Sequence, residues 1–255
     1  DWSSDVCSSD PTRRSSDLIF RVAGKDASRY LNGRLTRNIS TMAASDARQS
    51  LLLTPQGKVQ ASLWVIKLDA EFLLITEATP DSFKSKDQFI SELLQFKVAD
   101  QISVEDVTEK FFSYLINSKL VDSLSKGTNA PESLVGFWPS ALEPGFSLYV
   151  SSSPITSIDF GDAKDLNDLR FTLGFPSFEN AFFKGLNTGE FNSAKMIDFD
   201  KGCYAGQEVV ERLGALGKAS RVLALLSVEL QADADMNSIV GERLLVGGDN
   251  SGLTI

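Results

Sequence analysis

Residues 201–212 read KGCYAGQEVVER, and they hold the candidate reactive side chain of the chain, the thiol of Cys203. The spacing of the apolar residues in QEVVERL predicts a helix that begins just after Gly206. The N–H groups at a helix start and a nearby ammonium group both favour a thiolate, so we take Cys203 and Lys201 as the candidate catalytic residues. Gly202 and Gly206 leave the backbone around the thiol open to a close approach.

A free cysteine is also commonly a small buried apolar residue, and the spacing alone leaves both roles open for Cys203. Glu208 offsets part of the positive charge of Lys201. The chain has no histidine and only one other cysteine, Cys7, which excludes an imidazole base and a four-thiolate cluster site within one chain. Cys203 must therefore act with something that is brought to it: a partner's cluster, a small thiol or a bound ligand.

The composition bounds the class of protein. With 255 residues, 42% of them hydrophobic, the chain can bury a substantial core. Its net charge of −9 disfavours direct binding to nucleic acid, which needs a basic face. No apolar run approaches the roughly 20 residues that span a bilayer. Two cysteines are too few for a disulfide framework, so we expect a cytoplasmic protein.

The patterning divides the chain into three parts. Residues 1–17 contain SSD three times without apolar periodicity, and we expect a disordered or non-native tail. Residues 18–221 mix strand and helix patterns without a regular βαβ repeat, which predicts an α+β domain. Residues 222–255 read as short strands between Gly, Asp and Asn turns, the start of an incomplete all-β module. The expected strands of the α+β domain are 18–24, two runs around the turn at 55–57, 71–77, 101–108, 110–117 and 147–152, and the expected helices are 26–33 and 79–96.

The eight residues from Lys201 to Glu208 match the signature K-G-C-[YF]-x-G-Q-E of the YgfZ family, folate-binding proteins related to the glycine-cleavage aminomethyltransferase. The matching positions are Lys201, Gly202, Cys203, Tyr204, Gly206, Gln207 and Glu208. Upstream, AGKDASRYLNGRLT resembles the family's G-x-D-A-x-x-[FY]-L-x-G-[QR]-x-T, and LTPQGKV resembles its segment with P-x-G-[KR]. Asp168 and Arg170, followed by Gly174-Phe175-Pro176, resemble its D-x-x-R…G-x-P segment. The resemblance runs from about residue 18 to the end of the chain.

This resemblance implies an aminomethyltransferase-like folate-binding domain followed by a C-terminal β-barrel. It also implies tetrahydrofolate or another reduced folate as cofactor, and a role in assembling or maintaining iron–sulfur clusters, including those of tRNA-modifying enzymes. The partners would then be iron–sulfur client enzymes or cluster-assembly proteins, and we expect a monomer.

Three residues are candidates for binding the folate. Arg170 could pair with a folate carboxylate in bidentate fashion, or form a surface ion pair. Leu166 stands where some family members have a tryptophan that would stack on the ligand. Tyr204 would either stack on the ligand or anchor the loop.

The chain departs from the aminomethyltransferases at two places. Their G-G-x-x-D-D-like stretch corresponds here to residues 57–62, which contain no carboxylate, and Thr172 stands where they have a glutamate. Folate-dependent aminomethyl transfer is therefore the second hypothesis. A third is a thiol enzyme unrelated to folate, with Lys201 favouring the thiolate.

Four further residues have structural interpretations. Asp26 is expected to cap the first helix rather than to act as a catalytic acid. Trp64 alternates within a strand and should lie in the core. Asp198 and Asp200 alternate with apolar neighbours and read as the solvent face of a strand.

Overall fold

The structure is a computed structural model, and it describes residues 17–77, 86–117, 134–139, 146–154, 185–191, 193–216, 243–245 and 252–254. The chain divides into two units, Asp1–Leu223 and Ala224–Ile255. The first unit contains the KGCYAGQE segment and the described elements that contact it.

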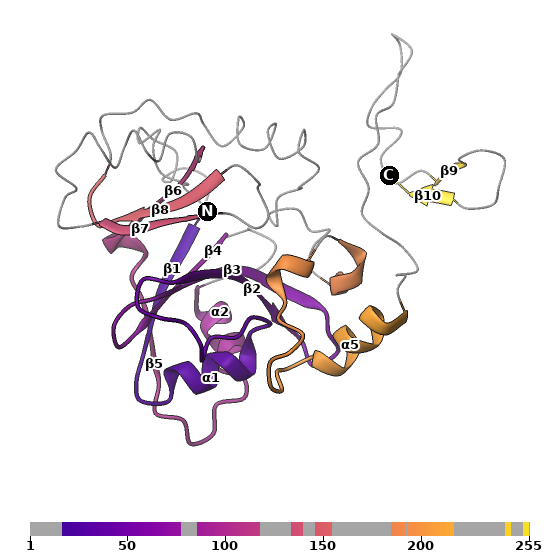
Figure 1. Cartoon of the computed structure of the whole chain (residues 1–255), viewed down its shortest axis with the longest axis horizontal. Helices are drawn as coiled ribbons and strands as arrows, with labels where there is room; N and C mark the ends of the chain where they lie inside the picture. The colour runs from indigo at the N-terminus through magenta and orange to yellow at the C-terminus, as the bar shows by residue number, and fades with distance from the viewer. Residues whose placement is uncertain are drawn as a thin grey trace, which may run out of the picture. The chain divides into compact units, whose positions relative to one another are not determined.

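A five-stranded sheet forms the centre of the first unit (Figure 1). Its strands are β1 (Asp17–Ala23), β2 (Ala47–Leu53), β3 (Val59–Lys67), β4 (Phe72–Glu77) and β5 (Ser103–Asp106). They lie in the order β2-β3-β4-β1-β5, and each neighbouring pair is antiparallel. The alternating apolar runs therefore form the expected strands, and antiparallel pairing agrees with an α+β fold rather than with a doubly wound one.

Helices α1 (Ala27–Arg34) and α2 (Lys86–Leu93) cover one face of this sheet. Their buried side chains, Tyr30, Leu31, Phe89 and Leu93 among them, share one apolar cluster with residues of β1, β3 and β4. The Phe20 and Phe89 rings stack with centroids 4.5 Å apart. The helix expected over 79–96 ends at Leu93, and its first residues, up to 85, lie outside the part of the chain that the structure describes.

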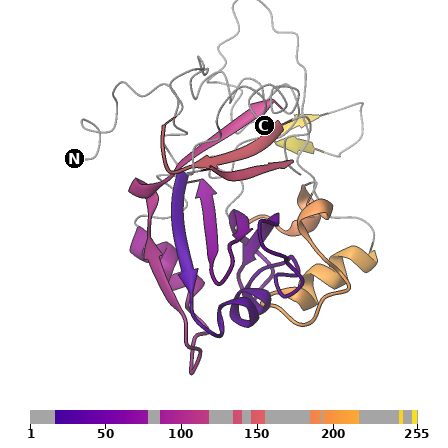
Figure 2. The ribbon, with the colours of Figure 1, turned by 60° about the vertical axis from the view of Figure 1, so that its left-hand side comes forward.

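A three-stranded antiparallel sheet covers one part of the opposite face (Figure 2). Its strands are β6 (Phe112–Asn117), β8 (Phe146–Ser151) and β7 (Leu134–Pro139), in that order across the sheet. Leu148 and Val150 pack against Ile19, Ile66 and Trp64 of the larger sheet, so the prediction that Trp64 is a core residue is confirmed.

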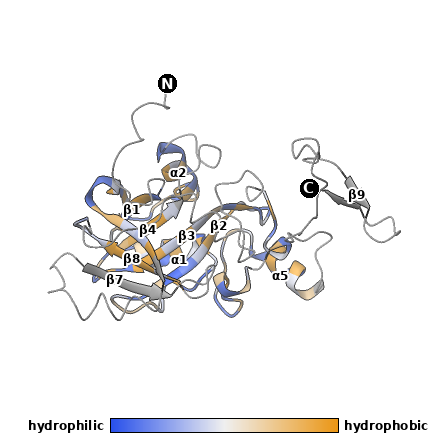
Figure 3. Cartoon of the chain, turned by 90° about the horizontal axis from the view of Figure 1, so that it is seen from above, coloured by the Kyte–Doolittle hydropathy of each residue, from blue (hydrophilic) through white to orange (hydrophobic). Residues whose placement is uncertain are grey.

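Residues 185–191 and 193–216 cover the other part of that face. Leu51 and Leu53 alternate with Leu52, whose side chain joins the cluster under the helices, and they point to the side away from α1 and α2. Helix α5 (Gln207–Leu216) is amphipathic, with apolar and charged residues side by side in Figure 3. The third apolar cluster of the unit comprises Leu51, Leu53, Val59, Met196, Ile197, Tyr204 and Val210.

The first strand begins one residue earlier than expected. Strand β1 begins at Asp17, and the carboxylate of this buried residue accepts a hydrogen bond from the Ser113 hydroxyl.

In the second unit, β9 (Arg243–Leu245) and β10 (Gly252–Thr254) form an antiparallel pair. Within the described residues, no helix has the length and apolar character needed to cross a membrane.

Candidate functional site

The thiol of Cys203 is exposed on the loop that leads into α5. The loop runs from Lys201 to Gly206, and α5 begins at Gln207, four residues after the cysteine. The thiol thus lies just before the helix start, as the apolar spacing predicts. Since Cys203 is exposed, the alternative of a buried packing residue does not describe it.

Two glycines allow this loop to dock closely on the turn between β2 and β3. Gly206 has φ +86°, and a Cβ there would lie 2.7 Å from the carbonyl oxygen of Thr54 and 3.0 Å from the Cα of Gly57. Gly57 has φ +71°, and a Cβ there would lie 2.7 Å from the Cβ of Val209. An L side chain would be strained by the backbone conformation and would also clash at either position. The LTPQGKV and KGCYAGQE segments are therefore packed backbone to backbone.

Gly202 differs from Gly206. It is exposed, and a Cβ built on it would meet no atom within 4 Å among the described residues. The close approach of backbone that the glycines were expected to allow is seen at Gly206, whereas Gly202 borders space next to the thiol that no described atom fills.

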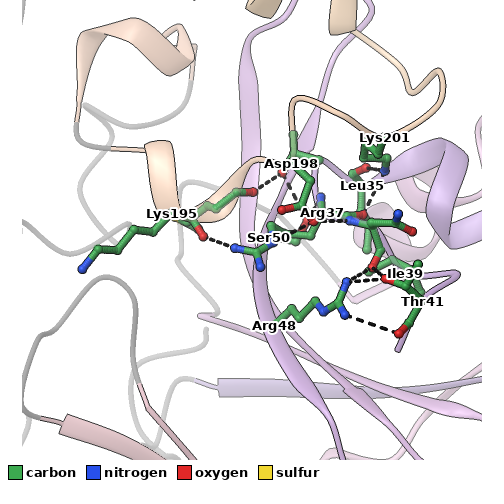
Figure 4. A network of polar contacts seen from close by, with 12 residues as sticks. Leu35, Arg37, Ile39, Thr41, Arg48, Ser50, Lys195, Asp198 and Lys201 are labelled. Carbon is green, nitrogen blue, oxygen red and sulfur yellow. Dashed lines mark hydrogen bonds and ion pairs between the residues drawn. The ribbon is translucent and has the colours of Figure 1, made fainter. Parts of the chain in front are cut away.

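Lys201 is buried, and its ammonium group points into the first unit (Figure 4). Nζ donates to the carbonyl oxygens of Asn32 at 2.6 Å and Arg37 at 2.8 Å, and also to that of Leu35. Burial lowers the pKa of Lys201 to about 8, and the nearby carboxylate of Asp198 opposes this shift. The amine is therefore still protonated at neutral pH, with its three N–H groups directed at the backbone around the end of α1.

The KGCYAGQE loop closes the C-terminal end of α1. The last carbonyl groups of a helix have no partner within the helix. Here the Asn32 carbonyl accepts from Lys201, and the Gly33 carbonyl accepts from the N–H of Ala205 at 3.1 Å. A cation at this end also interacts favourably with the helix dipole. The AGKDASRYLNGRLT and KGCYAGQE segments are far apart in sequence but are joined by these hydrogen bonds.

Tyr204 and Gln207 hold the loop from its other side. The Tyr204 ring lies in the third apolar cluster, 4.9 Å from Lys201 Nζ, which favours the anchoring role over stacking on a ligand. Burial raises the pKa of Tyr204 to about 12, with a smaller contribution from Glu211. The Tyr204 N–H donates to Gln207 Oε1 at 3.3 Å. Glu208 is exposed in the first turn of α5, where a negative charge is favourable.

Several known proteins are similar to this chain in sequence. The chain is 25% identical to the tRNA-modifying protein YgfZ of Colwellia psychrerythraea, over 88% of this chain and 73% of that protein. It is 27% identical to the mitochondrial iron-sulfur cluster assembly factor IBA57 homolog of Neurospora crassa, over 79% of this chain and 49% of that protein. Further matches of 21% and 23% identity are also named tRNA-modifying protein YgfZ, from Shigella dysenteriae and Klebsiella pneumoniae.

Relatives named YgfZ or IBA57 homolog are thus 21–27% identical to the chain over most of its length. It spans about half the length of the Neurospora relative, and no family model matches it. Among solved structures, the aminomethyltransferase T of the Bartonella henselae glycine cleavage system superposes with a TM-score of 0.61 at 11% identity. That match covers 80% of this chain and 62% of the other, and it shows the aminomethyltransferase fold.

Two side chains that hold the segment leading into the KGCYAGQE loop, those of Thr36 and Arg37, were not predicted from the sequence. Thr36 is fully buried, donates its hydroxyl to the Met196 carbonyl at 2.6 Å, and accepts from the Leu51 N–H at 2.9 Å. Arg37 Nε donates to the Asp198 carboxylate at 3.1 Å, and the same carboxylate accepts from the N–H of Asn38 (Figure 4). Thr36 belongs to the AGKDASRYLNGRLT resemblance, so its place in that motif was the available signal.

One local expectation is wrong and another holds only in part. Asp198 and Asp200 do not lie on a strand but in the irregular segment between the single 3-10 turn Ala194–Met196 and Lys201. Asp26 occupies the N-cap position of α1, but its side chain makes no capping bond to the helix; it accepts from the N–H of Gln101 at 2.8 Å. In both cases a carboxylate finds a partner far away in sequence, which a local pattern does not reveal.

The folate-binding candidates Arg170 and Leu166, together with Thr172, lie outside the described residues. Over the ranges that the structure describes, no three His, Cys, Asp or Glu side chains are grouped so that they could hold a metal ion.

A Thr36→Val variant should lose about 1–3 kcal/mol of stability, because valine keeps the shape but leaves the buried Leu51 N–H and Met196 carbonyl without this hydroxyl. Thr41→Val is the matched control, since Thr41 is exposed and water can replace its hydroxyl bonds. Urea unfolding measures both. Equal effects of the two substitutions would show that the Thr36 bonds do not stabilise the docking of this segment.

Proposed function

We propose that this protein is a folate-binding accessory protein that supports the assembly or maintenance of iron–sulfur clusters in client enzymes, including methylthiolating tRNA-modifying enzymes, through the thiol of Cys203. The observation that carries the proposal is the contrast within the loop. Lys201 and Tyr204 are buried, Ala205 and Gly206 are docked against α1 and the β2–β3 turn, and Cys203 is exposed beside Gly202. A loop built with this much support holds its one exposed reactive group in a fixed place.

The chemistry of a single thiol limits what it can do. Cys203 has no imidazole to act with, because the chain has no histidine, and one thiolate supplies a quarter of the ligands that a typical cluster needs. Sulfur is nonetheless the ligand that iron–sulfur clusters prefer. We therefore treat the cluster as cargo of a partner, to which Cys203 contributes one ligand or one nucleophile. The names of the YgfZ and IBA57 relatives support this role.

The folate part of the proposal rests on the family and the aminomethyltransferase fold. The residues that would hold the glutamyl carboxylate and the ring, Arg170 and Leu166, stand outside the described ranges. Within those ranges, the Tyr204 ring is buried in the apolar cluster beneath the loop, which favours its anchoring role. Reduced folate, when bound, would supply one-carbon or redox chemistry.

Aminomethyl transfer is the weaker hypothesis because of residues 57–62. This segment has no carboxylate of its own. The carboxylate of Glu92 reaches it from α2, but it accepts from the side-chain amides of Gln60 at 2.8 Å and Gln88 at 2.9 Å. Both carboxylate oxygens of Glu92 are thus already engaged by side-chain amides.

We also propose that residues 222–255 contribute to a C-terminal β-barrel of the kind that the family implies. The antiparallel pair β9–β10 supports an all-β unit there. The protein would act as a monomer that meets its client transiently, and its net charge of −9 favours contact with a protein partner over direct contact with tRNA.

Arg170→Ala should weaken tetrahydrofolate binding by about 1.5–3 kcal/mol, the contribution of a hydrogen bond to a charged group. Isothermal titration of the full chain with tetrahydrofolate measures this, with Arg29→Ala, an exposed arginine paired with Asp26 and Asp100, as the matched control. Unchanged affinity would remove Arg170 from the site. If the wild-type protein binds no reduced folate, the folate part of the proposal fails.

A further inference from the structure

We propose that Lys201 is a positioning residue: its ammonium group fixes the Cys203 loop on the C-terminal end of α1. The inference rests on the proposed function, because it assigns to Lys201 the task of holding the thiol in place. It replaces the expectation that Lys201 acts by placing a positive charge next to the sulfur.

The number and arrangement of acceptors support this role. An ammonium group has three N–H donors, and Lys201 has three carbonyl acceptors, those of Asn32, Leu35 and Arg37. Asn32 belongs to the last turn of α1, and the other two follow the helix. One side chain thus draws together the end of α1, the segment behind it and the loop that carries Cys203.

The same contacts argue against a direct electrostatic action on the thiol. Lys201 is 6% exposed, and its charge is directed at backbone carbonyls within the fold, whereas Cys203 is open to solvent. The Tyr204 ring also lies 4.9 Å from Nζ and attracts the cation on a further side. The carboxylate of Asp198 is a second nearby group that offsets its field.

The contact between Ala205 and Gly33 can report on the clamp, by which we mean the three hydrogen bonds from Lys201 Nζ to the carbonyl groups of Asn32, Leu35 and Arg37. The N–H of Ala205 is bonded to the Gly33 carbonyl, one residue from the Asn32 carbonyl that Lys201 holds. If Lys201 fixes the loop, removing its donors should free this amide while leaving the central sheet intact. If Lys201 merely adds to the stability of the whole unit, amides of the loop and of β3 should open together.

The test is amide hydrogen exchange of the full chain carrying Lys201→Met, which keeps the apolar stem but has no donor. We expect exchange in residues 202–206 to accelerate about tenfold or more, because charge-assisted hydrogen bonds are lost, and exchange in β3 to stay unchanged. Lys67→Met is the matched control, since Lys67 also lies over an aromatic ring, that of Phe72 at 4.3 Å, but far from the loop in sequence. Unchanged exchange in 202–206, or equal acceleration in β3, would overturn the inference.

Alkylation of Cys203 gives a second measurement, which distinguishes a positioning role of Lys201 from a direct electrostatic effect on the thiol. Iodoacetate is an anion and iodoacetamide is neutral, so a positive charge acting on the thiol site accelerates the first relative to the second. We expect the ratio of the two rate constants to be the same in wild type and Lys201→Met. A ratio that falls more than about threefold in the variant would show that the charge acts on the thiol site.

If Lys201→Met does not fold, Lys201→Gln serves instead, because its amide keeps two donors without the charge. Amide exchange in residues 202–206 of this variant should be faster than in the wild type but slower than in a fully detached loop. An exchange rate equal to that of the wild type would contradict the clamp. The result is separable from the proposed function. A loosened loop in Lys201→Met together with full client support by Cys203→Ser would keep the clamp and reject the function.

Discussion

Replacing Gly206 by alanine is expected to destabilise the first unit by about 2–5 kcal/mol. Part of this cost is the positive φ of +86°, which an L side chain adopts at a penalty. The rest comes from the added methyl group, which would lie 2.7 Å from the Thr54 carbonyl oxygen and 3.0 Å from the Gly57 Cα. Both neighbours are backbone, so they cannot rotate away as a flexible side chain could.

Gly202→Ala is the matched control for that prediction. Gly202 lies in the same loop, directly after Lys201, and it is exposed. A Cβ built on it would meet no described atom within 4 Å, so the substitution should change the stability by no more than about 0.5 kcal/mol. Urea unfolding of the two variants measures the difference. Similar stabilities would mean that the loop does not dock on the β2–β3 turn as described.

Replacing Cys203 by serine is expected to leave the fold intact and to abolish support of the client enzyme. The side chain is exposed, so the exchange of sulfur for oxygen changes few packing contacts and should cost less than about 0.5 kcal/mol. Serine keeps the size but is a poor ligand for the soft metals that thiolates bind. Urea unfolding and complementation of cells that lack their own copy of the protein measure the two effects.

A loss of several kcal/mol in Cys203→Ser would indicate a packing role and contradict the exposed position of the thiol. Lys67→Met is the control for the cellular assay, because it changes a lysine that has no part in the proposed site. Lys201→Met should reduce client support less than Cys203→Ser, since it loosens the loop but keeps the sulfur.

The strands of the central sheet could be predicted because their apolar residues form short runs or alternate along the chain. In the structure, successive apolar side chains enter clusters on opposite faces of the sheet. Trp64 illustrates this: its place in an alternating run is sufficient to predict burial against the second sheet. The KGCYAGQE segment could likewise be recognised, and its helix placed, from spacing and motif. These signals lie within short stretches of sequence, so they can be recognised without a structure.

The direction of the Lys201 side chain could not be predicted in the same way. Its acceptors are carbonyl groups at the end of a distant helix, and backbone acceptors leave no trace in the residue types. The same holds for Gly206 and Gly57, which appear in separate motifs but are neighbours only after the chain folds. The strand predicted around Asp198 failed for a related reason: alternation over a few residues also arises when Ile197 is buried and Phe199 is half-exposed in an irregular segment.

The central claim is that the exposed thiol of Cys203 performs the function and that the rest of the loop holds it in place. It is tested most directly by the fraction of methylthiolated nucleoside in tRNA from cells that carry Cys203→Ser as their sole copy, measured by mass spectrometry at matched protein levels. We expect this fraction to fall to the level of cells without the protein, whereas Lys67→Met should give the wild-type fraction. A wild-type fraction in Cys203→Ser cells would show that the Cys203 thiol is not needed for the function.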